Sequence, residues 1–242
     1  MGSTTCEAVA ADRDLELVAA VGQRSAGQRR GGITIAPALE ALTDAGAQVV
    51  VDFTVAAVTR EMLPWLAANG LHVIVGTTGF DDADIHMARV AFTRSNCLFA
   101  ANFAIGAVLM MRMAEMAAPF FDTAEIIELH HDGKTDAPSG TAMATAARMA
   151  AAPGEWAPDP TTHEVVEGAR GGVGPAGIHL HSVRMRGMVA HQEVILGTAG
   201  QTLSIRHDSF DRASFMPGVV LACKRVADHP GVTVGLDALL RI

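Results

Sequence analysis

Two adjacent histidines and a nearby lysine form the group of residues best suited to proton chemistry: His130, His131 and Lys134. An imidazole can give or take a proton near neutral pH. A lysine ammonium brings a compact positive charge on a flexible stem, and a tight turn would return Lys134 to the pocket of His130. Any one of these residues alone would be ordinary polar surface, but together they predict a site that protonates a substrate.

The residues directly after the lysine predict the start of a helix. Pro138-Ser139-Gly140-Thr141 precede an Ala- and Met-rich stretch, 142–152, that contains no helix breaker. Ser139 is a suitable N-cap, and the exposed backbone N–H groups behind it would suit a carboxylate or phosphate. The whole cluster therefore predicts a site for an anionic substrate that needs a proton.

Short β-branched stretches alternate with helical ones over the first hundred residues. Strands are predicted over 15–21, 47–53, 71–75 and 97–101, and helices over 3–11, 36–45, 55–69 and 82–94. This alternation predicts an α/β fold with a doubly wound parallel sheet. Ligands of such sheets bind in a crevice beyond the carboxyl ends of the strands. The segments expected to face that crevice, because each directly follows a strand, are 52–54, 76–78 and 102–103.

The chain changes character after residue 103. A helix is predicted over 105–118, and its methionines are expected to serve packing: Met110, Met111, Met113 and Met116. Strands are predicted over 125–129, 178–183, 191–196 and 203–208, with a hairpin connection at 197–200. The Pro- and Gly-rich stretch 153–177 predicts a long mobile loop, a candidate lid. These elements indicate a second, α+β domain with a mixed or antiparallel sheet, before a tail with a helix and a strand at 232–234.

Composition limits the classes of function. The chain has 242 residues, of which 50% are hydrophobic and 18% charged, so it can bury a sizeable core. It lacks an apolar run of membrane-spanning length and a recognisable secretory signal. Three widely spaced cysteines suit a reducing cytosol, so a cytoplasmic location is expected. The net charge of −8 and the scarcity of aromatic residues disfavour nucleic-acid binding.

The stretch 128–142 resembles the motif of the 4-hydroxy-tetrahydrodipicolinate reductase (dihydrodipicolinate reductase) family of bacterial lysine and diaminopimelate synthesis. That motif reads Glu-x-His-His-x-x-Lys-x-Asp-Ala-Pro-Ser-Gly-Thr-Ala, and every fixed position is present. Further matching segments follow in the family's order: 51–54, 75–80, 102–103, 191–194, 214–215 and 217–218. The chain is therefore identified as a member of this family over almost its whole length.

The resemblance implies a domain organisation and a reaction. It implies a discontinuous Rossmann-like dinucleotide-binding domain, 1–102 plus 214–242, and a substrate-binding and tetramerisation domain, 103–213, in a homotetramer. It implies hydride transfer from NADPH or NADH to the ring of dihydrodipicolinate, a small dicarboxylate, followed by protonation of a ring carbon. His130 matches the general acid, and Lys134 matches the positive partner of the nascent carbanion or a second proton source.

The same resemblance assigns the binding residues. The substrate-binding positions are His131, Gly140 and Thr141. The cofactor-binding positions are Gly76, Thr77, Thr78, Ala100, Ala101, Asn102 and Phe103. Two residues depart from the family's usual pattern, because Ala101 stands where relatives commonly have proline and Gly133 where they often have histidine.

The glycine-rich loop of a dinucleotide-binding domain is the missing part of the pattern. Such a domain opens with a strand, Gly-x-x-Gly-x-x-Gly and a helix, whereas residues 3–11 already predict the helix. Met1-Gly2 resembles the Met-Gly pair that ends this loop in the family, which makes Gly2 the one loop glycine we name. We expect that roughly a dozen residues, a strand and most of the loop, are absent through a misassigned start or a truncation.

Cofactor preference depends on the residues after Val21. An acidic residue there would bind the ribose hydroxyls of NAD, but this chain has Gly22-Gln23-Arg24-Ser25. Arg24 could accept a 2′-phosphate, which favours NADPH over NADH. The alternative is that Arg24 belongs to a solvated loop.

Several other polar residues are interpreted as structural. His179 and His181 share one face of a predicted strand, but without a third ligand they do not predict a metal site. The residues interpreted as serving subunit contacts or strand polarity are Arg184, His191, Glu193, Arg206 and His207. Two alternative functions remain at this point: a two-domain dehydrogenase for a different small acid, and a cofactor-impaired pseudo-enzyme or dicarboxylate-binding module.

Overall fold

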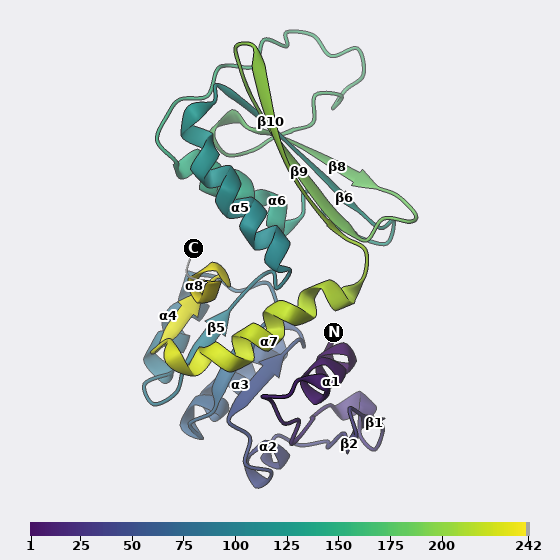
Figure 1. Ribbon diagram of the computed structural model, residues 1–242, viewed down its shortest axis with the longest axis vertical. Coiled ribbons are helices and arrows are strands. Elements are labelled where there is room, and N and C mark those ends of the chain that lie inside the picture. The colour runs from purple at the N-terminus through teal and green to yellow at the C-terminus, as the bar shows by residue number, and fades with distance from the viewer. Residues whose placement is uncertain (241–242) are drawn as a thin grey trace. The chain divides into compact units, whose positions relative to one another are not determined.

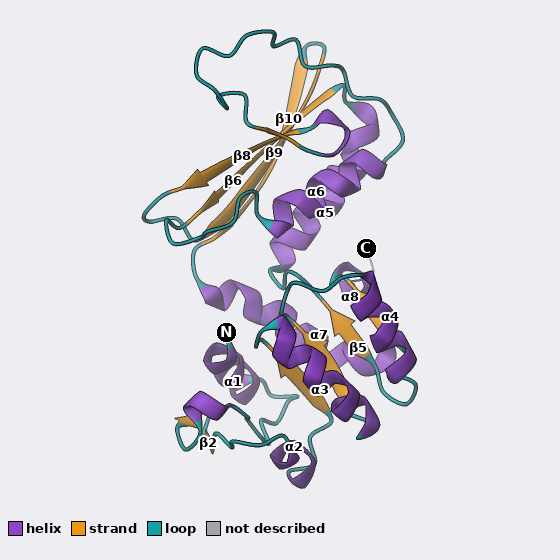
Figure 2. Cartoon of the chain, turned by 180° about the vertical axis from the view of Figure 1, so that it is seen from behind, coloured by secondary structure: helices purple, strands orange, loops and turns teal. Residues whose placement is uncertain are grey.

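The computed structural model describes residues 1–240 (Figure 1). The chain divides into two compact units, one made of Met1–Ile105 with Phe215–Ile242 and the other of Gly106–Ser214. Each unit has its own sheet and its own helices (Figure 2). None of the helices in residues 1–240 combines the length and apolarity that a membrane crossing requires.

The first unit contains a four-stranded parallel sheet in the order β11-β5-β4-β3. Its strands are β3 (Val49–Asp52), β4 (His72–Val75), β5 (Cys97–Phe99) and β11 (Val232–Val234). The central strand is fully enclosed, because Val73, Ile74 and Val75 have no exposed surface. The strands predicted over 47–53, 71–75, 97–101 and 232–234 are confirmed, as continuous apolar runs are typical of strands covered on both faces.

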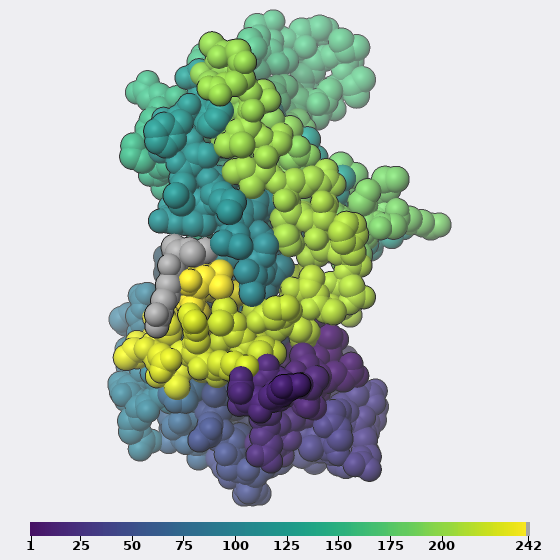
Figure 3. All heavy atoms as spheres, viewed as in Figure 1, coloured from purple at the N-terminus to yellow at the C-terminus, as the bar shows by residue number. Residues whose placement is uncertain are grey.

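Helices cover this sheet and connect its strands. They are α1 (Gly2–Ala11), α2 (Glu40–Asp44), α3 (Ala56–Ala68), α4 (Asp82–Ala91), α7 (Met216–Arg225) and α8 (Asp237–Leu240), with short 3₁₀ turns η1 (Gln23–Ser25) and η5 (Val226–Asp228). A small hairpin joins β1 (Arg29–Arg30) and β2 (Ile33–Thr34). The N-terminal helix α1 lies against α7 (Figure 3), where the Lys224 ammonium pairs with Asp12 at 2.8 Å and Asp14 at 2.7 Å.

The strand predicted over 15–21 is wrong. This segment makes a single bridge, between Val21 and Ala36, and joins none of the three sheets. A strand exists only where a neighbour shares its backbone hydrogen bonds, and within residues 1–240 the edge strand β3 of the parallel sheet pairs with β4 alone. The helix predicted over 36–45 is shortened to α2, because Pro37 disfavours helical geometry at Ala36.

The second unit contains a five-stranded mixed sheet in the order β10-β9-β6-β8-β7. Its strands are β6 (Thr123–His130), β7 (Gly172–Val173), β8 (His179–Arg184), β9 (Ala190–Thr198) and β10 (Gln201–Ser209). Only β6 and β8 are parallel, and β9 turns into β10 through Ala199-Gly200, as the predicted hairpin requires. The mixed sheet and its four longer strands confirm the prediction for this half.

Two helices, α5 (Ile105–Ala117) and α6 (Gly140–Ala151), pack on one face of this sheet (Figures 1 and 2). Ile126, Val194, Ala146 and Met149 have no exposed surface, which places the core between the helices and the sheet. Met110 and Met111 are buried as expected, but Met113 and Met116 are 51% and 61% exposed. Packing was therefore the wrong interpretation for those two, because they lie on the outer side of α5.

The stretch 153–177 is a loop that carries only β7 and the turn η3 (Pro175–Gly177). The Ala157 N–H of this loop donates to the carbonyl of Asp122, just before β6, at 2.8 Å. The Arg170 guanidinium pairs with Glu125 of β6 and, within the loop, with Asp159. The remaining 3₁₀ turns of the chain are η2 (Ala118–Phe120) and η4 (Arg212–Phe215).

Candidate active site

The candidate site of the second unit begins with a carboxylate inside its core. Side chains alternate along β6, so Ala124, Ile126 and Glu128 all face α5 and α6 and are buried. Glu128 has no exposed surface. A buried carboxylate is costly unless it is paired and hydrogen-bonded, so its partners define what this part of the structure is built around.

Glu128 accepts hydrogen bonds from three segments of the unit. Both terminal nitrogens of Arg184, on β8, donate to it at 2.9 and 2.8 Å, and the Ser139 N–H donates at 3.2 Å. The Nδ1 nitrogen of His130 makes a further, short contact. Burial tends to raise the pKa of Glu128, but the hydrogen bonds from Arg184, Ser182 and His130 outweigh it and hold the pKa below its usual value. Glu128 is thus an ionised carboxylate in a buried site.

His130 lies at the end of β6 with 16% of its side chain exposed. Because an ionised carboxylate only accepts, Nδ1 of His130 carries the hydrogen, and Nε2 is the nitrogen that can exchange a proton. Burial lowers the pKa of His130 below its usual value, while the charge of Glu128 opposes that shift and the charges of Lys134 and Arg184 add to it. The geometry is that of an imidazole held by a carboxylate, as in acid–base catalysis.

Lys134 follows in a tight turn, closed by its own N–H donating to the His131 carbonyl at 3.1 Å. Its ammonium pairs with both oxygens of Asp136, at 2.7 and 2.8 Å. The Arg184 guanidinium also donates to the Asp136 carbonyl at 2.7 Å, so the arginine that holds Glu128 holds this turn as well. The predicted turn exists, and Asp136 is an additional partner that the sequence interpretation missed.

The helix predicted after residue 139 is α6, and its N-cap is the predicted one. The Ser139 hydroxyl accepts from the Ala142 N–H at 3.2 Å. A Cβ built at Gly140 would meet nothing within 4 Å, so the backbone there is open to a ligand. His131 is exposed beside the same loop. The structure therefore links His130, the loop that carries Lys134 and the start of α6 through Glu128 and Arg184.

A second group of predicted residues lies at the carboxyl ends of β3, β4 and β5 in the first unit. A Cβ at Gly76 would lie 2.1 Å from the Phe53 ring, and Phe53 packs edge-to-face on Phe103 with ring centres 5.6 Å apart. The Thr77 hydroxyl is buried and has no hydrogen-bond partner among the described residues. A turn that only glycine fits, followed by an unsatisfied hydroxyl, suits a bound polar ligand such as a dinucleotide.

Other contacts fix the same edge of the sheet. Arg60 donates to the Gly79 carbonyl at 2.8 Å and pairs with Asp84 at 2.7 Å, which fastens the turn after β4. Asn102 accepts from the Ala104 N–H at 2.8 Å after β5. Around these contacts Thr78 and Ala101 are exposed, whereas Ala100 is buried. The predicted positions 76–78 and 100–103 thus share one edge of the sheet.

Two predicted cofactor residues lie elsewhere in this unit. Arg24 is exposed in η1, and Gly2 is the first residue of α1, where an added Cβ would meet nothing within 4 Å. The structure shows no contact that joins either of them to the turn at 76–78.

Arg184 corrects an interpretation made from the sequence. The sequence predicts subunit contacts or strand polarity for it, whereas the structure shows that it is the bidentate partner of buried Glu128. Strand alternation could have shown that Glu128 requires a cation, because it shares a buried face with Ala124 and Ile126, but not that Arg184 is that cation.

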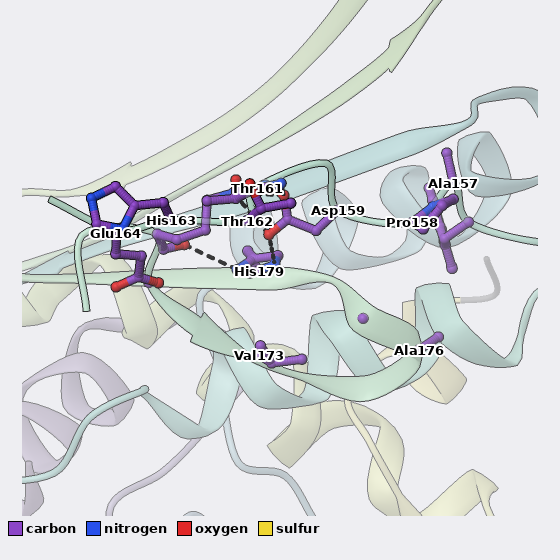
Figure 4. Close-up of a pocket in the computed structure, with 14 residues that line it drawn as sticks. Ala157, Pro158, Asp159, Thr161, Thr162, His163, Glu164, Val173, Ala176 and His179 are labelled. Carbon is purple, nitrogen blue, oxygen red and sulfur yellow. Dashed lines mark hydrogen bonds and ion pairs between the residues drawn. The ribbon is translucent and has the colours of Figure 1, made fainter. Parts of the chain in front are cut away.

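A concavity of about 480 Å³ lies elsewhere in the second unit, under the loop 156–177 (Figure 4). The Asp159 carboxylate is directed at His179, whose Nε2 is 3.0 Å away. None of the residues predicted from the sequence to act in catalysis or binding lines this concavity. His181 pairs with Glu125 at 2.7 Å, and no group of three or more His, Cys, Asp or Glu within residues 1–240 is arranged to hold a metal ion.

Comparison with known proteins identifies the family to which the chain belongs. The family descriptions "Dihydrodipicolinate reductase, N-terminus" and "Dihydrodipicolinate reductase, C-terminus" match residues 1–103 and 106–240. The chain is 48% identical to a 4-hydroxy-tetrahydrodipicolinate reductase of Cutibacterium acnes and 49% identical to one of Nocardia farcinica. Each alignment covers 99% of this chain and 94% of the relative.

A solved structure extends the likeness to three dimensions. The dipicolinate-bound dihydrodipicolinate reductase of Paenisporosarcina sp. TG-14 superimposes with a TM-score of 0.85 at 36% identity, over 98% of this chain and 94% of that one. Sequence and structure agree over almost the full length, and this chain belongs to the dihydrodipicolinate reductase family.

Proposed function

We propose that the chain is an NAD(P)H-dependent 4-hydroxy-tetrahydrodipicolinate reductase of lysine and diaminopimelate biosynthesis. The observation that carries the proposal is that buried Glu128 contacts both His130 and the capped start of α6, while Arg184 holds Glu128 and the loop that carries Lys134. The relative from Paenisporosarcina is bound to dipicolinate, a planar dicarboxylate, and an open helix N-terminus suits such an anion.

Each residue has a chemical role in this proposal. The backbone N–H groups of Gly140 and Thr141, with His131, bind a substrate carboxylate. His130 delivers the proton from Nε2, and the Lys134 ammonium offsets the negative charge on the substrate as it forms. Bound NADPH or NADH supplies the hydride, and the residues assigned to hold it are Gly76, Thr77, Thr78, Ala100, Ala101, Asn102 and Phe103.

The test is NADPH oxidation by the purified chain, followed by absorbance with freshly generated 4-hydroxy-tetrahydrodipicolinate as substrate. We expect turnover with this substrate and none with simple keto acids or monocarboxylic imines. Turnover with those instead would favour a dehydrogenase of another small acid. Binding of dipicolinate without any turnover would favour a dicarboxylate-binding module.

We propose that the chain prefers NADPH, because Arg24 is an exposed cation in the loop that would face the adenosine ribose. Changing Arg24 to Ala should raise the KM for NADPH roughly three- to tenfold and leave the KM for NADH unchanged, since loss of one exposed charge–phosphate contact costs about 1 kcal/mol. Arg29→Ala, in the adjacent hairpin, is the matched control. Equal effects on both cofactors would remove Arg24 from the site.

We propose that the second unit associates into a homotetramer and that the chain works in the cytoplasm. The sheet face opposite α5 and α6 carries Ile127, Leu129, Val183 and Ile195, all partly exposed, and a partner subunit would cover them. Sedimentation of the purified chain tests the tetramer, and a monomer at micromolar concentration would contradict it.

The proposed cytoplasmic location is supported by the three cysteines, which are free thiols and suit a reducing compartment.

A further inference from the structure

We propose that Glu128 is a positioning residue for this reaction: one buried carboxylate sets the tautomer of His130 and ties the imidazole to the anion-binding start of α6. The inference rests on the proposed function for the roles of His130 and α6. It concerns a residue that touches no substrate and acts only through its neighbours.

The contacts of Glu128 are divided between its two oxygens. Oε1 accepts from Arg184 Nη2 and from the Ser139 N–H, at 2.8 and 3.2 Å. Oε2 accepts from Arg184 Nη1 at 2.9 Å and contacts His130 Nδ1. A single side chain therefore connects the proposed acid, the N-cap of α6 and the neighbouring strand β8.

The tautomer follows from the chemistry of the carboxylate. Since Glu128 can only accept at Nδ1, His130 must carry a hydrogen there, and proton exchange with a substrate is confined to Nε2. When Nε2 also gains a proton, the resulting imidazolium lies against a negative charge in a buried site, which stabilises the form that a general acid needs.

The charges that face His130 come from three elements. Glu128 is on its own strand, Arg184 is on β8, and Lys134 is in the following loop. Burial and both cations favour neutral imidazole, and Glu128 alone opposes them. Removing the charge of Glu128 should therefore lower the pKa of His130 further, and a merely structural role would leave it unchanged.

A matched control is present on the same strand. Glu125, on the opposite face of β6, also pairs with an arginine and a histidine, Arg170 and His181. Glu125→Gln removes the same chemistry from the same strand without touching His130, so it separates a loss of local charge from a loss of positioning.

The first measurement is NMR of the chain labelled with 15N-histidine and free of cofactor. We expect the His130 ring to be in the Nδ1–H form, and Glu128→Gln to lower its midpoint of titration by about one pH unit, since one unit is the usual size of a single charge–charge effect. Glu125→Gln should leave the His130 resonances in place. An unmoved midpoint in Glu128→Gln would overturn the proposal.

The second measurement is a double-mutant cycle in turnover. Glu128→Gln should lower kcat about 10- to 100-fold, as changes to an orienting partner commonly do, and less than twofold when His130 is already Gln. An equal loss in both backgrounds would show that Glu128 acts through general stability. A wild-type chain without reductase activity would refute the proposed function, whereas the NMR result would still decide whether Glu128 positions His130.

If Glu128→Gln does not fold, Glu128→Gln/Arg184→Met removes both buried charges together and carries the same NMR test. The His130 midpoint should again fall relative to the wild type, because loss of the nearby carboxylate outweighs loss of the more distant guanidinium. A midpoint at or above the wild-type value would contradict the positioning role.

Discussion

Changing His130 to Gln should lower kcat by a factor on the order of a hundred or more and leave the affinity for NADPH unchanged. Glutamine keeps a hydrogen-bonding side chain at the end of β6 but cannot deliver a proton. The residues assigned to the cofactor belong to the other unit, so their contacts with one another are unaffected. Steady-state turnover and NADPH fluorescence titration measure the two quantities separately.

The control for this change is His181→Gln, because His181 also pairs with a glutamate on β6 but lies outside the site. It should keep turnover within about twofold of wild type, as expected for a partly exposed pair. If His130→Gln turns over normally, the proton comes from another group, and Lys134 becomes the first candidate.

The pH dependence follows from the same residue. Burial holds the pKa of His130 below its usual value of about 6.5, and a general acid works only in its protonated form. The value of kcat/KM should therefore fall as pH rises through the His130 pKa, with the falling limb starting below pH 6.5. This limb should be lost in His130→Gln, and a limb centred near pH 10 would indicate a lysine instead.

The sequence predicted most reliably what is encoded locally. The strands around Val50, Ile74 and Leu98 could be predicted because continuous apolar runs between helical stretches have few other solutions. The segment 15–21 has a similar composition but makes one bridge, because a strand depends on a neighbour that no local pattern specifies. The same limit applies to α5, where composition could not show that Met113 faces outward.

The candidate site also combines features that depend on residues close in sequence with features that depend on distant ones. The motif at 128–142 predicted the candidate acid–base residues and the N-cap at Ser139, since both depend on residues close in sequence. Arg184 is 56 residues from Glu128, and only the parallel register of β6 and β8 brings them together. The central ion pair of the site therefore became visible only with the tertiary structure.

Changing Arg184 to Met should lower the unfolding free energy of the second unit by about 3–5 kcal/mol at pH 7, the usual cost of leaving a buried carboxylate without its partner. Glu128 has no exposed surface, and methionine fills similar volume without a donor. Urea unfolding followed by Trp156 fluorescence, with Trp65 changed to Phe, reports on this unit because Trp156 packs against its core.

The pH dependence of this loss distinguishes an electrostatic cause from a packing defect. In the wild type the folded-state pKa of Glu128 is lowered, so its stabilisation is present above the unfolded pKa of about 4.3 and lost as pH falls through the folded pKa. In Arg184→Met the buried carboxyl has lost that partner, and its folded pKa should rise above 4.3. Protonation then favours the folded variant, and its deficit should shrink as pH falls toward 5.

Two further variants separate the effect of burial from the loss of an ion pair. Arg170→Met removes the arginine of Glu125, but side chains there are 26% and 31% exposed, so the loss should stay below about 1 kcal/mol. Glu128→Gln/Arg184→Met removes both buried charges and should recover at least half of the single-variant loss, because an uncharged pair has no desolvation penalty to offset. Equal losses for Arg170→Met and Arg184→Met, or a deficit independent of pH, would show that the buried pair contributes no more than its packing.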